Sequence, residues 1–372
     1  MQSSNNIYLN RIDVLRFVAA TLVIFWHYIH FDVIPAGYLP GFFPFSILEE
    51  GHTGVSFFMV LSGFIFQFIN DGRQIDFPKF LRNRFFRIFP LAIFWILIEV
   101  AVNHLNSVEA LLNTIFIFDS QSVPGVGWTI VVEFQFYMIF PVLHKVIEKK
   151  SGIWNILGLI ALMIIVRSLL YVNVDSLYRL SYFTIFGRLD QFLIGMIAAK
   201  LYSSGPGALF FSKPQLEKLR LGLLVMVVTV LLLAFYLFNR IGGLEGLTLT
   251  HLRSATWIIY HDIEAIFYAT IIVLFLSINR YSLLTPIENA LAKCGEFSYS
   301  MYWLHFPVIK AVCVMLRRYH IFYPGSFNTI VLVGFLIVLP TIVFIAGLSY
   351  TFYEKPFLQF REKALFHRWR CI

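Results

Sequence analysis

Apolar residues recur along this chain in runs of about twenty, and short polar segments separate the runs. A run of that length crosses the hydrocarbon core of a bilayer as an α-helix. Since lipid offers no hydrogen bonds to an open backbone, the pattern predicts an all-α, polytopic membrane helix bundle with about ten transmembrane helices. The predicted spans are roughly residues 12–31, 54–70, 86–103, 128–147, 153–172, 182–202, 220–238, 256–278, 296–316 and 328–352.

The composition supports the same class of protein. Of the 372 residues, 59% are hydrophobic and 13% are charged, whereas a soluble domain carries about 25% charged residues. The sequence shows no strong internal repeat and no low-complexity tract, so residues 1–372 are predicted to form a single transmembrane domain with no additional soluble domain. The three cysteines have neither disulfide-framework nor metal-ligand spacing, and no metal is expected.

Lysine and arginine are distributed unevenly between the two predicted faces of the bundle. Twenty lie on the face that holds both termini, six on the opposite face, and three within spans. The positive-inside rule therefore predicts that both termini are cytoplasmic. This topology, together with attraction to anionic lipid headgroups, accounts for the net charge of +8, so no nucleic-acid partner is expected.

The first predicted span carries the ionisable side chains of Asp13, Arg16 and His27. Asp13 lies one turn before Arg16, within reach of an ion pair, and His27 follows Arg16 by eleven residues, which is close to three turns. One interpretation is that Asp13 and Arg16 satisfy each other at the inner interface and that His27 is an interfacial histidine. Because a charge facing lipid costs several kcal/mol, their common stripe favours a groove inside the bundle that is filled with water or substrate.

Glu133 lies in the outer half of the fourth predicted span, at a depth similar to that expected for His27. A carboxylate beside a histidine fixes the tautomer and raises the basicity of the imidazole, so this pair suits acid–base chemistry. The alternative is a structural glutamate bonded to a neighbouring helix. Structural pairing is favoured for Asp262 and Glu264. It competes evenly with a functional role at three further in-span positions, Arg188, Asp190 and His305.

Arg84 and Arg87 lie one turn apart at the start of the third predicted span. Two guanidinium groups on one helical face can clamp phosphates. Basic residues are also typical of an inner membrane edge, so this pair alone does not separate the two interpretations.

Seven segments along nearly the whole chain resemble the acyltransferase 3 family of bacterial integral membrane acyltransferases. The most specific features are an Arg followed eleven residues later by His, an Arg-x-x-Arg motif before the third span, and a Trp five residues before an in-span Glu. The matching segments, in order, are RIDVLRFVAATLVIFWH, GVSFFMVLSGFIF, RNRFFRIFP, WTIVVEFQFYMIFPVL, GRLDQFLIGMIAA, YSMYWLHFPVI and YEKPF.

The resemblance implies transfer of an acyl group, usually acetyl from acetyl-CoA, to a hydroxyl of an envelope carbohydrate. It implies that Arg16 and His27 form the family's essential pair and that Arg84 and Arg87 contact the acyl-CoA. The remaining matches are Trp128 and Glu133 in the fourth-helix motif, and His305 and Glu354 in late-chain motifs.

One motif departs from the family pattern. The family's Trp-Ser pair reads Trp128-Thr129 here, which keeps the hydroxyl. The chain also ends soon after the tenth predicted span, so the esterase-like domain of some family members is expected to be absent.

These inferences assign three groups of site residues. The expected catalytic residues are His27, Glu133 and Arg16. The expected acyl-CoA contacts are Arg84, Arg87 and Arg16. The expected acceptor contacts are Trp128, His305 and Asp13. His27 would either deprotonate the acceptor hydroxyl or carry the acyl group itself.

The expected setting is the bacterial inner membrane, with membrane lipids around a multi-pass chain and a homodimer as one candidate assembly. The expected acceptor is an O-antigen, an exopolysaccharide or a lipid-linked sugar. Predicted outer loops 32–53 and 104–127 are aromatic, which suits sugar stacking and is also typical of a membrane interface.

Two other classes of protein remain as alternatives. A transporter or flippase of a polysaccharide precursor would also carry polar groups in a bundle, but it would more often show repeated halves with broken helices, which the sequence lacks. A scaffold without catalytic activity would not need a stripe of His, Glu and Arg.

Overall fold

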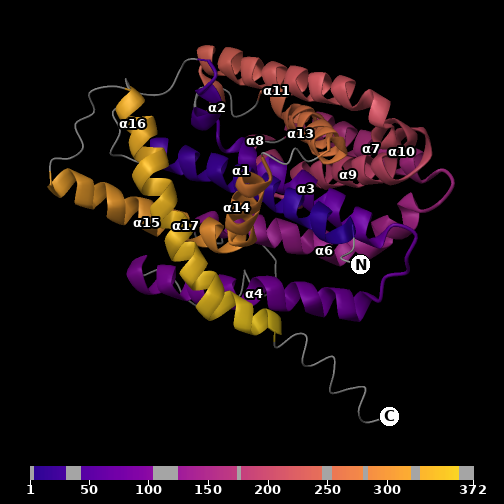
Figure 1. Ribbon diagram of the computed structural model, residues 1–372. Helices are drawn as coiled ribbons and strands as arrows, with labels where there is room; N and C mark the ends of the chain where they lie inside the picture. Colours follow the sequence, from indigo (N-terminus) through magenta and orange to yellow (C-terminus); the bar gives the residue numbers. More distant parts are fainter. Residues whose placement is uncertain are drawn as a thin grey trace, which may run out of the picture.

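The computed structural model of the chain describes residues 4–30, 43–103, 125–173, 177–244, 254–279, 284–319 and 327–359 (Figure 1). Every regular element in these ranges is helical, which confirms the predicted all-α class. Most of the two predicted aromatic loops, at 31–42 and 104–124, lies outside the described residues.

Eight of the described helices are long and apolar enough to cross a membrane, so the chain is a multi-pass membrane protein. Six of them lie within single elements: α1 (Ser4–Ile29), α3 (Thr53–Asn70), α6 (Trp128–Ile147), α7 (Gly152–Asn173), α13 (Tyr260–Ser277) and α15 (Ser298–Arg318). The seventh, Pro214–Arg240, joins a short 3-10 turn to α11 (Glu217–Arg240). The eighth, Ile330–Gln359, joins most of α16 (Phe327–Val333), η7 (Gly334–Val338), α17 (Leu339–Ser349) and η8 (Tyr350–Glu354).

Two of the ten predicted spans are helical but are not among these eight helices. Residues 86–103 belong to α4 (Phe77–Asn103), and residues 182–202 belong to the end of α8 (Leu177–Phe183) and most of α9 (Ile185–Ser203). α9 carries Arg188, Asp190 and Lys200 within its nineteen residues, which lowers its apolar character. Both helices contribute side chains to the interior described below.

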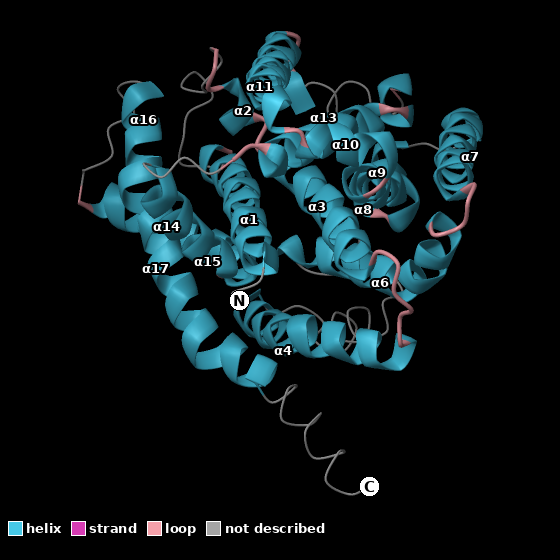
Figure 2. Cartoon of the chain, turned by 45° about the vertical axis from the view of Figure 1, so that its right-hand side comes forward, coloured by secondary structure: helices cyan, strands magenta, loops and turns pink. Residues whose placement is uncertain are grey.

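The helices form one bundle in which α1 and α3 lie near the centre (Figures 1 and 2). α11 lies along one edge above α13, and α4 runs beneath α1 and α6. α7 flanks α9 on one side of the bundle, and α15, α16 and α17 lie on the side away from α7. Shorter elements connect them: α2 (Ser46–Glu49), η3 (Gly125–Gly127), α10 (Gly205–Ser212), η4 (Pro214–Leu216), η5 (Ala255–Ile258) and α14 (Thr285–Glu296).

α3 and α9 cross at backbone contact because both carry glycine at the crossing. A Cβ added to Gly63 would lie 2.0 Å from the carbonyl oxygen of Phe192, and one added to Gly195 would lie 2.2 Å from that of Val60. Small residues of this kind let membrane helices approach closely and gain dispersion energy. The crossing fixes the two helices that carry Ser62 and Arg188.

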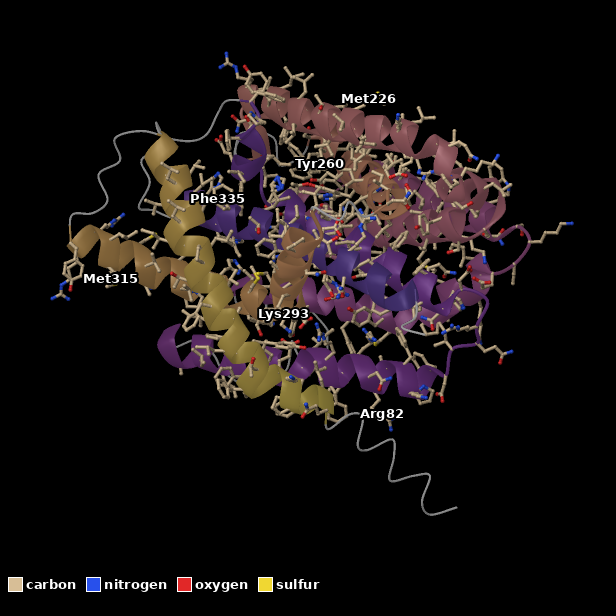
Figure 3. The ribbon with its side chains drawn as sticks, viewed as in Figure 1. Arg82, Met226, Tyr260, Lys293, Met315 and Phe335 are labelled. Atoms are coloured by element: carbon tan, nitrogen blue, oxygen red, sulfur yellow. The ribbon has the colours of Figure 1, made fainter. Side chains whose placement is uncertain are left out.

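The periphery of the bundle is apolar. In the most apolar stretch of α11 only 11% of the residues are buried, and in that of α7 only 17%. Met226 on α11 and Met315 on α15 point away from the interior, whereas Tyr260 lies beneath α11 (Figure 3). Phe335 in η7 is exposed at the edge of the bundle, and its ring packs 4.5 Å from that of the buried Phe25. Such surfaces suit contact with lipid tails.

The last helix contains two π-helical segments, η7 and η8. A π turn adds a residue to the helical repeat and re-aims the side chains that follow. η8 ends at Glu354, whose carboxylate is buried and pairs with Arg87 of α4 at 3.0 Å. The C-terminal helix is thereby tied to the helix that carries the Arg-x-x-Arg motif.

Candidate functional site

A basic cavity of about 120 Å³ lies among α1, α3, α4, α6 and α15, and we refer to it as the arginine cavity. Three guanidinium groups line it, from Arg16 of α1 and from Arg84 and Arg87 of α4. Its other polar lining residues are Ser62, Thr129, Glu133, Tyr137, Ser298, Tyr299 and Tyr302.

Fixed partners hold the ionised groups of the arginine cavity. Arg16 donates to Asp13 at 2.8 Å, which confirms the ion pair predicted one turn apart on the first helix. The carboxylate of Glu133 accepts a hydrogen bond from Ser62 at 3.1 Å and another from Tyr137. The guanidinium of Arg84 lies 4.7 Å from the centre of the Phe66 ring, in a cation–π contact. These contacts pre-orient a basic surface.

A second cavity, of about 470 Å³, is lined by His27 and His52, and we refer to it as the histidine cavity. Its walls are mainly aromatic, which distinguishes it from the arginine cavity. The aromatic lining residues are Trp26, Trp95, Trp128, Tyr178, Tyr182, Phe183, Tyr302, Trp303 and Phe306.

Five helices line both cavities, and they do so in alternating directions. α1, α4 and α15 reach the arginine cavity first and the histidine cavity later in the sequence, as from Arg16 to His27. α3 and α6 run the other way, as from Trp128 to Glu133. Helices that alternate in this manner place the two cavities at different depths along the bundle.

Backbone carbonyls determine the tautomers of two contacting histidines. Nδ1 of His27 lies 2.9 Å from the carbonyl of Val23, and Nδ1 of His305 lies 2.6 Å from that of Tyr302. A carbonyl oxygen only accepts, so both Nδ1 atoms carry hydrogen. Nε2 of His305 lies 3.2 Å from Nδ1 of His27 and must therefore be the acceptor.

The tautomer of His27 determines the state of its other ring nitrogen, Nε2. With its proton on Nδ1, the neutral ring has its lone pair on Nε2. Among the described residues, Nε2 of His27 has no hydrogen-bonding partner. A half-buried imidazole on a cavity wall, with a free basic nitrogen and a fixed tautomer, can act as a general base or a nucleophile.

The expected pairing of Glu133 with His27 is wrong. Glu133 lines the arginine cavity and bonds to Ser62 and Tyr137, whereas His27 lines the histidine cavity and contacts His305. The reason is depth: α6 enters beside the histidine cavity at Trp128, and five residues of helix carry Glu133 about 7.5 Å further along the axis.

The other predicted site residues divide between the cavities and their surroundings. Trp128 lines the histidine cavity, packing against the rings of Tyr182 and Phe183. Asp13 and His305 line neither cavity, because each lies behind a lining residue that it contacts, Arg16 and His27 respectively. The geometry therefore favours positioning roles for Asp13 and His305 over the predicted contact with substrate.

A histidine–carboxylate contact at the wall of the histidine cavity was not predicted from the sequence. His52 lines the histidine cavity, and its Nε2 lies 3.4 Å from Oε2 of Glu50. Glu50 also accepts from the backbone N–H of Leu244 at 3.2 Å. Burial raises the pKa of Glu50 from 4.5 to about 7, and burial also lowers the pKa of His52. The only signal in the sequence was a Glu two residues before a His at the edge of a span.

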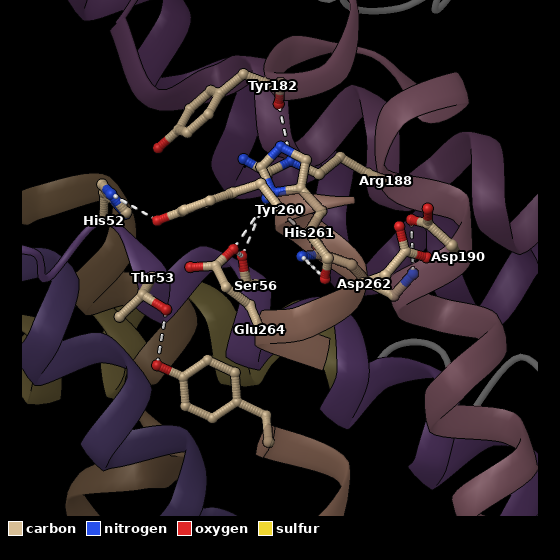
Figure 4. A network of polar contacts seen from close by, with 12 residues as sticks. His52, Thr53, Ser56, Tyr182, Arg188, Asp190, Tyr260, His261, Asp262 and Glu264 are labelled. Carbon is tan, nitrogen blue, oxygen red and sulfur yellow. Dashed lines mark hydrogen bonds and ion pairs between the residues drawn. The ribbon is translucent and has the colours of Figure 1, made fainter. Parts of the chain in front are cut away.

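Beside the histidine cavity lies a buried polar network that joins α3, α9 and α13 (Figure 4). Arg188 donates to Ser56 at 3.0 Å, and Ser56 donates to Glu264 at 2.7 Å. Arg167 of α7 pairs with Asp190 and, at 2.7 Å, with Asp262. Asp190 and Asp262 thus pair with Arg167, and Glu264 is bonded to Ser56. Structural partners for Asp262 and Glu264 are what the sequence favoured.

Arg188 connects this network to the wall of the histidine cavity. Its guanidinium carbon lies 4.3 Å from the centre of the Tyr182 ring and 5.6 Å from that of Trp128. Both rings line the cavity, whereas Arg188 does not. Arg188 therefore supports the aromatic wall from behind by cation–π contact.

The fold and the two cavities define a multi-pass helical membrane protein with a basic cavity and a histidine cavity in its interior. The sequence model of the acyltransferase 3 family, described as an acyltransferase domain, matches residues 9–350. The chain belongs to this family.

The chain is similar in sequence to O-acetyltransferases and putative O-acetyltransferases of Staphylococcus aureus. The chain is 28% identical over 252 residues to a protein of strain COL named putative O-acetyltransferase SACOL0978, covering 65% of this chain and 37% of that protein. It is 23% identical over 383 residues to O-acetyltransferase OatA of strain NCTC 8325, covering 94% of this chain and 57% of OatA. The chain thus matches well under two thirds of the length of these relatives. No solved structure matches it.

Proposed function

We propose that this chain is a membrane-embedded O-acyltransferase that moves an acyl group, acetyl in the simplest case, from cytoplasmic acyl-CoA to a hydroxyl of a cell-envelope carbohydrate. The observation that carries the proposal is the placement of three arginines in one cavity and a free imidazole nitrogen in the next. Family membership and the O-acetyltransferase names of the relatives support the same reaction class.

The arginine cavity is the proposed donor site. Guanidinium groups bind phosphates through paired, charge-assisted hydrogen bonds, and acyl-CoA carries several phosphates. Arg84 and Arg87 lie near the start of α4, on the side that the distribution of Lys and Arg predicts to be cytoplasmic. Glu354 contacts Arg87 at 3.0 Å and so pre-orients one of the two guanidinium groups.

His27 is the proposed base. The proton of the acceptor hydroxyl moves to Nε2, the oxygen attacks the thioester carbonyl carbon, and the C–S bond breaks. The imidazolium then returns the proton to the departing thiolate, so the products are the ester and free CoA. The Nδ1–H of His27 remains bonded to Val23 and His305 throughout. Attack by Nε2 itself, through an acyl-imidazole, is the second route on the same atom.

The histidine cavity is the proposed acceptor site. Its aromatic walls, including Trp26, Trp128 and Trp303, offer flat apolar faces on which a sugar ring can stack, and few polar groups lie between them. At about 470 Å³ it lies in the size range of small-molecule sites. We propose that an inner-membrane protein of this kind takes an exported or lipid-linked sugar from the outer side.

The experiment is to incubate purified protein in lipid nanodiscs with [¹⁴C]acetyl-CoA and an envelope polysaccharide fraction. Release of CoA together with label in the polysaccharide supports the proposal. A transporter or flippase would give neither signal, and that result would contradict the proposal. Accumulation of labelled protein without acceptor would favour the acyl-imidazole route over direct transfer.

A further inference from the structure

Two residues line both cavities among those that the structure describes, Val55 of α3 and Tyr302 of α15. All the other lining residues belong to one cavity only. The two cavities therefore adjoin at the side chains of Val55 and Tyr302, which border the direct path from the arginine cavity to His27.

Tyr302 is held in place at both ends. Its hydroxyl accepts a hydrogen bond from Thr129 at 2.7 Å and donates to the carbonyl of Val126 at 2.9 Å. Its own carbonyl accepts from Nδ1 of His305, the ring that contacts His27. Only 8% of the residue is exposed. The position of the phenol ring is thus coupled to α6 on one side and to the catalytic imidazole on the other.

We infer that Tyr302 is the specificity-determining partition between donor and acceptor sites, limiting both the length of the transferred acyl group and the access of water to the thioester. The inference rests on the proposed function. If the thioester enters from the arginine cavity, the acyl carbon meets His27 beside the Tyr302 ring, and any longer chain must extend past that ring. We expect a short acyl group to occupy this position without displacing the Thr129–Tyr302 hydrogen bond.

The partition has a second consequence. When no acceptor is bound, water in the larger cavity can attack the thioester carbonyl carbon, breaking the C–S bond to give the free carboxylic acid and CoA. Tyr302 borders the junction of the two cavities and so limits the approach of that water to the thioester. Removing the ring should therefore raise hydrolysis relative to transfer, whereas loss of a merely structural tyrosine would lower both rates together.

The test compares Tyr302→Ala and Tyr302→Phe with the wild type, using acetyl-, butyryl- and hexanoyl-CoA with and without acceptor. For Tyr302→Ala we expect the kcat/KM ratio of hexanoyl to acetyl donor to rise at least about 10-fold, since pocket contacts of a methylene or two discriminate on this scale. CoA release without acceptor should rise relative to transfer. Tyr302→Phe, which keeps the ring, should change the leak more than the chain-length ratio.

A matched control exists elsewhere in the bundle. Tyr268 is also buried, its hydroxyl lies 2.8 Å from that of Thr53, and it lines neither cavity. Tyr268→Ala and Tyr268→Phe remove a comparable ring and hydroxyl and should leave both ratios unchanged. If Tyr302→Ala does not fold, Val55→Ala widens the same partition from the opposite side and should shift the chain-length ratio in the same direction.

The outcomes separate the two proposals. A wild-type protein that releases no CoA from any donor overturns the proposed function. A wild-type protein that transfers acetyl, with Tyr302 and Val55 variants that keep its chain-length ratio and its ratio of hydrolysis to transfer, overturns the partition alone.

Discussion

Nδ1 of His27 lies 3.2 Å from Nε2 of His305, although 278 positions separate the two residues in the sequence. Each ring also presents its Nδ1 to a carbonyl oxygen about one turn away along its own helix. The contact leaves Nε2 of His27 as the free basic nitrogen of the pair. We therefore propose that His305 positions the ring of His27, and this role is testable.

Replacing His305 by Leu should lower kcat by about 100-fold, because His27 loses the acceptor that fixes its ring, and general-base catalysis contributes about 10²–10⁴-fold. The KM for acyl-CoA should stay near the wild-type value, since His305 lies outside the arginine cavity. His305→Gln, which retains an acceptor oxygen, should recover part of the loss. Equal kcat in the Leu variant and the wild type would remove His305 from the mechanism.

Replacing Arg84 and Arg87 together by Ala should raise the KM for acetyl-CoA by about 10–100-fold for each phosphate left without its guanidinium partner, because hydrogen bonds to charged groups contribute about 1.5–3 kcal/mol. Acetyl-pantetheine lacks the phosphates of CoA. With this donor, the double variant and the wild type should have the same KM.

Arg82 supplies the matched control for this prediction. It lies on the same helix, does not line the arginine cavity and sits at the lower edge of the bundle (Figure 3). Arg82→Ala should leave the KM for acetyl-CoA unchanged. An effect of Arg82→Ala as large as that of the double variant would indicate a general charge effect at the membrane surface.

Glu50 and His52 should give opposite pH dependences of stability when they are replaced singly. Burial raises the pKa of Glu50 from 4.5 to about 7, so the folded protein holds a proton there that the unfolded chain releases. Burial lowers the pKa of His52 below 6.5, so the unfolded chain takes up a proton there that the folded protein refuses. Between about pH 4.5 and 6.5 the two effects offset each other.

In His52→Asn only Glu50 contributes, so the variant's own free energy of unfolding should fall as pH rises from 4.5 to 7, by about 3 kcal/mol in all. In Glu50→Gln only His52 contributes, so this variant's own free energy of unfolding should fall as pH decreases below 6.5. Chemical denaturation in detergent at several pH values measures both slopes. If the stability of both variants changed with pH in the same direction, the opposite pKa shifts of Glu50 and His52 would be refuted.

Gly63→Ala and Gly195→Ala should each destabilise the bundle by about 1–3 kcal/mol, because the added methyl group meets a backbone carbonyl of the facing helix. Gly158 of α7 is the control, since nothing lies within 4 Å of a Cβ added there. Gly158→Ala should be neutral or slightly stabilising, as Ala is the better helix former. Thermal unfolding in detergent would distinguish the two classes of variant.

The hydropathy pattern predicted the helical class and the approximate range of every described long helix, because length and apolar content alone define a span. The stripe on the first helix was also predictable: Arg16 and His27 are three turns apart, and both line interior cavities. Helical spacing fixes relations of this kind within one element.

Relations between helices were beyond the reach of spacing. The predicted depth of Glu133, level with His27, is wrong. The position of α6 relative to α1 depends on the tilt and offset of the two helices, and apolar content does not encode either. His305 was expected to contact substrate, yet it contacts His27. Glu50 and His52 were missed because, outside the apolar run, polar residues give no signal of burial.

In the proposed mechanism, Nε2 of His27 performs the acid–base or nucleophilic step of acyl transfer. The most direct measurement is the rate of [¹⁴C]acetyl transfer by His27→Ala in nanodiscs, alongside the dissociation constant of acetyl-CoA for the same preparation. We predict a rate at least about 100-fold below wild type with unchanged acetyl-CoA binding. A folded His27→Ala protein that transfers acetyl at the wild-type rate would contradict the account.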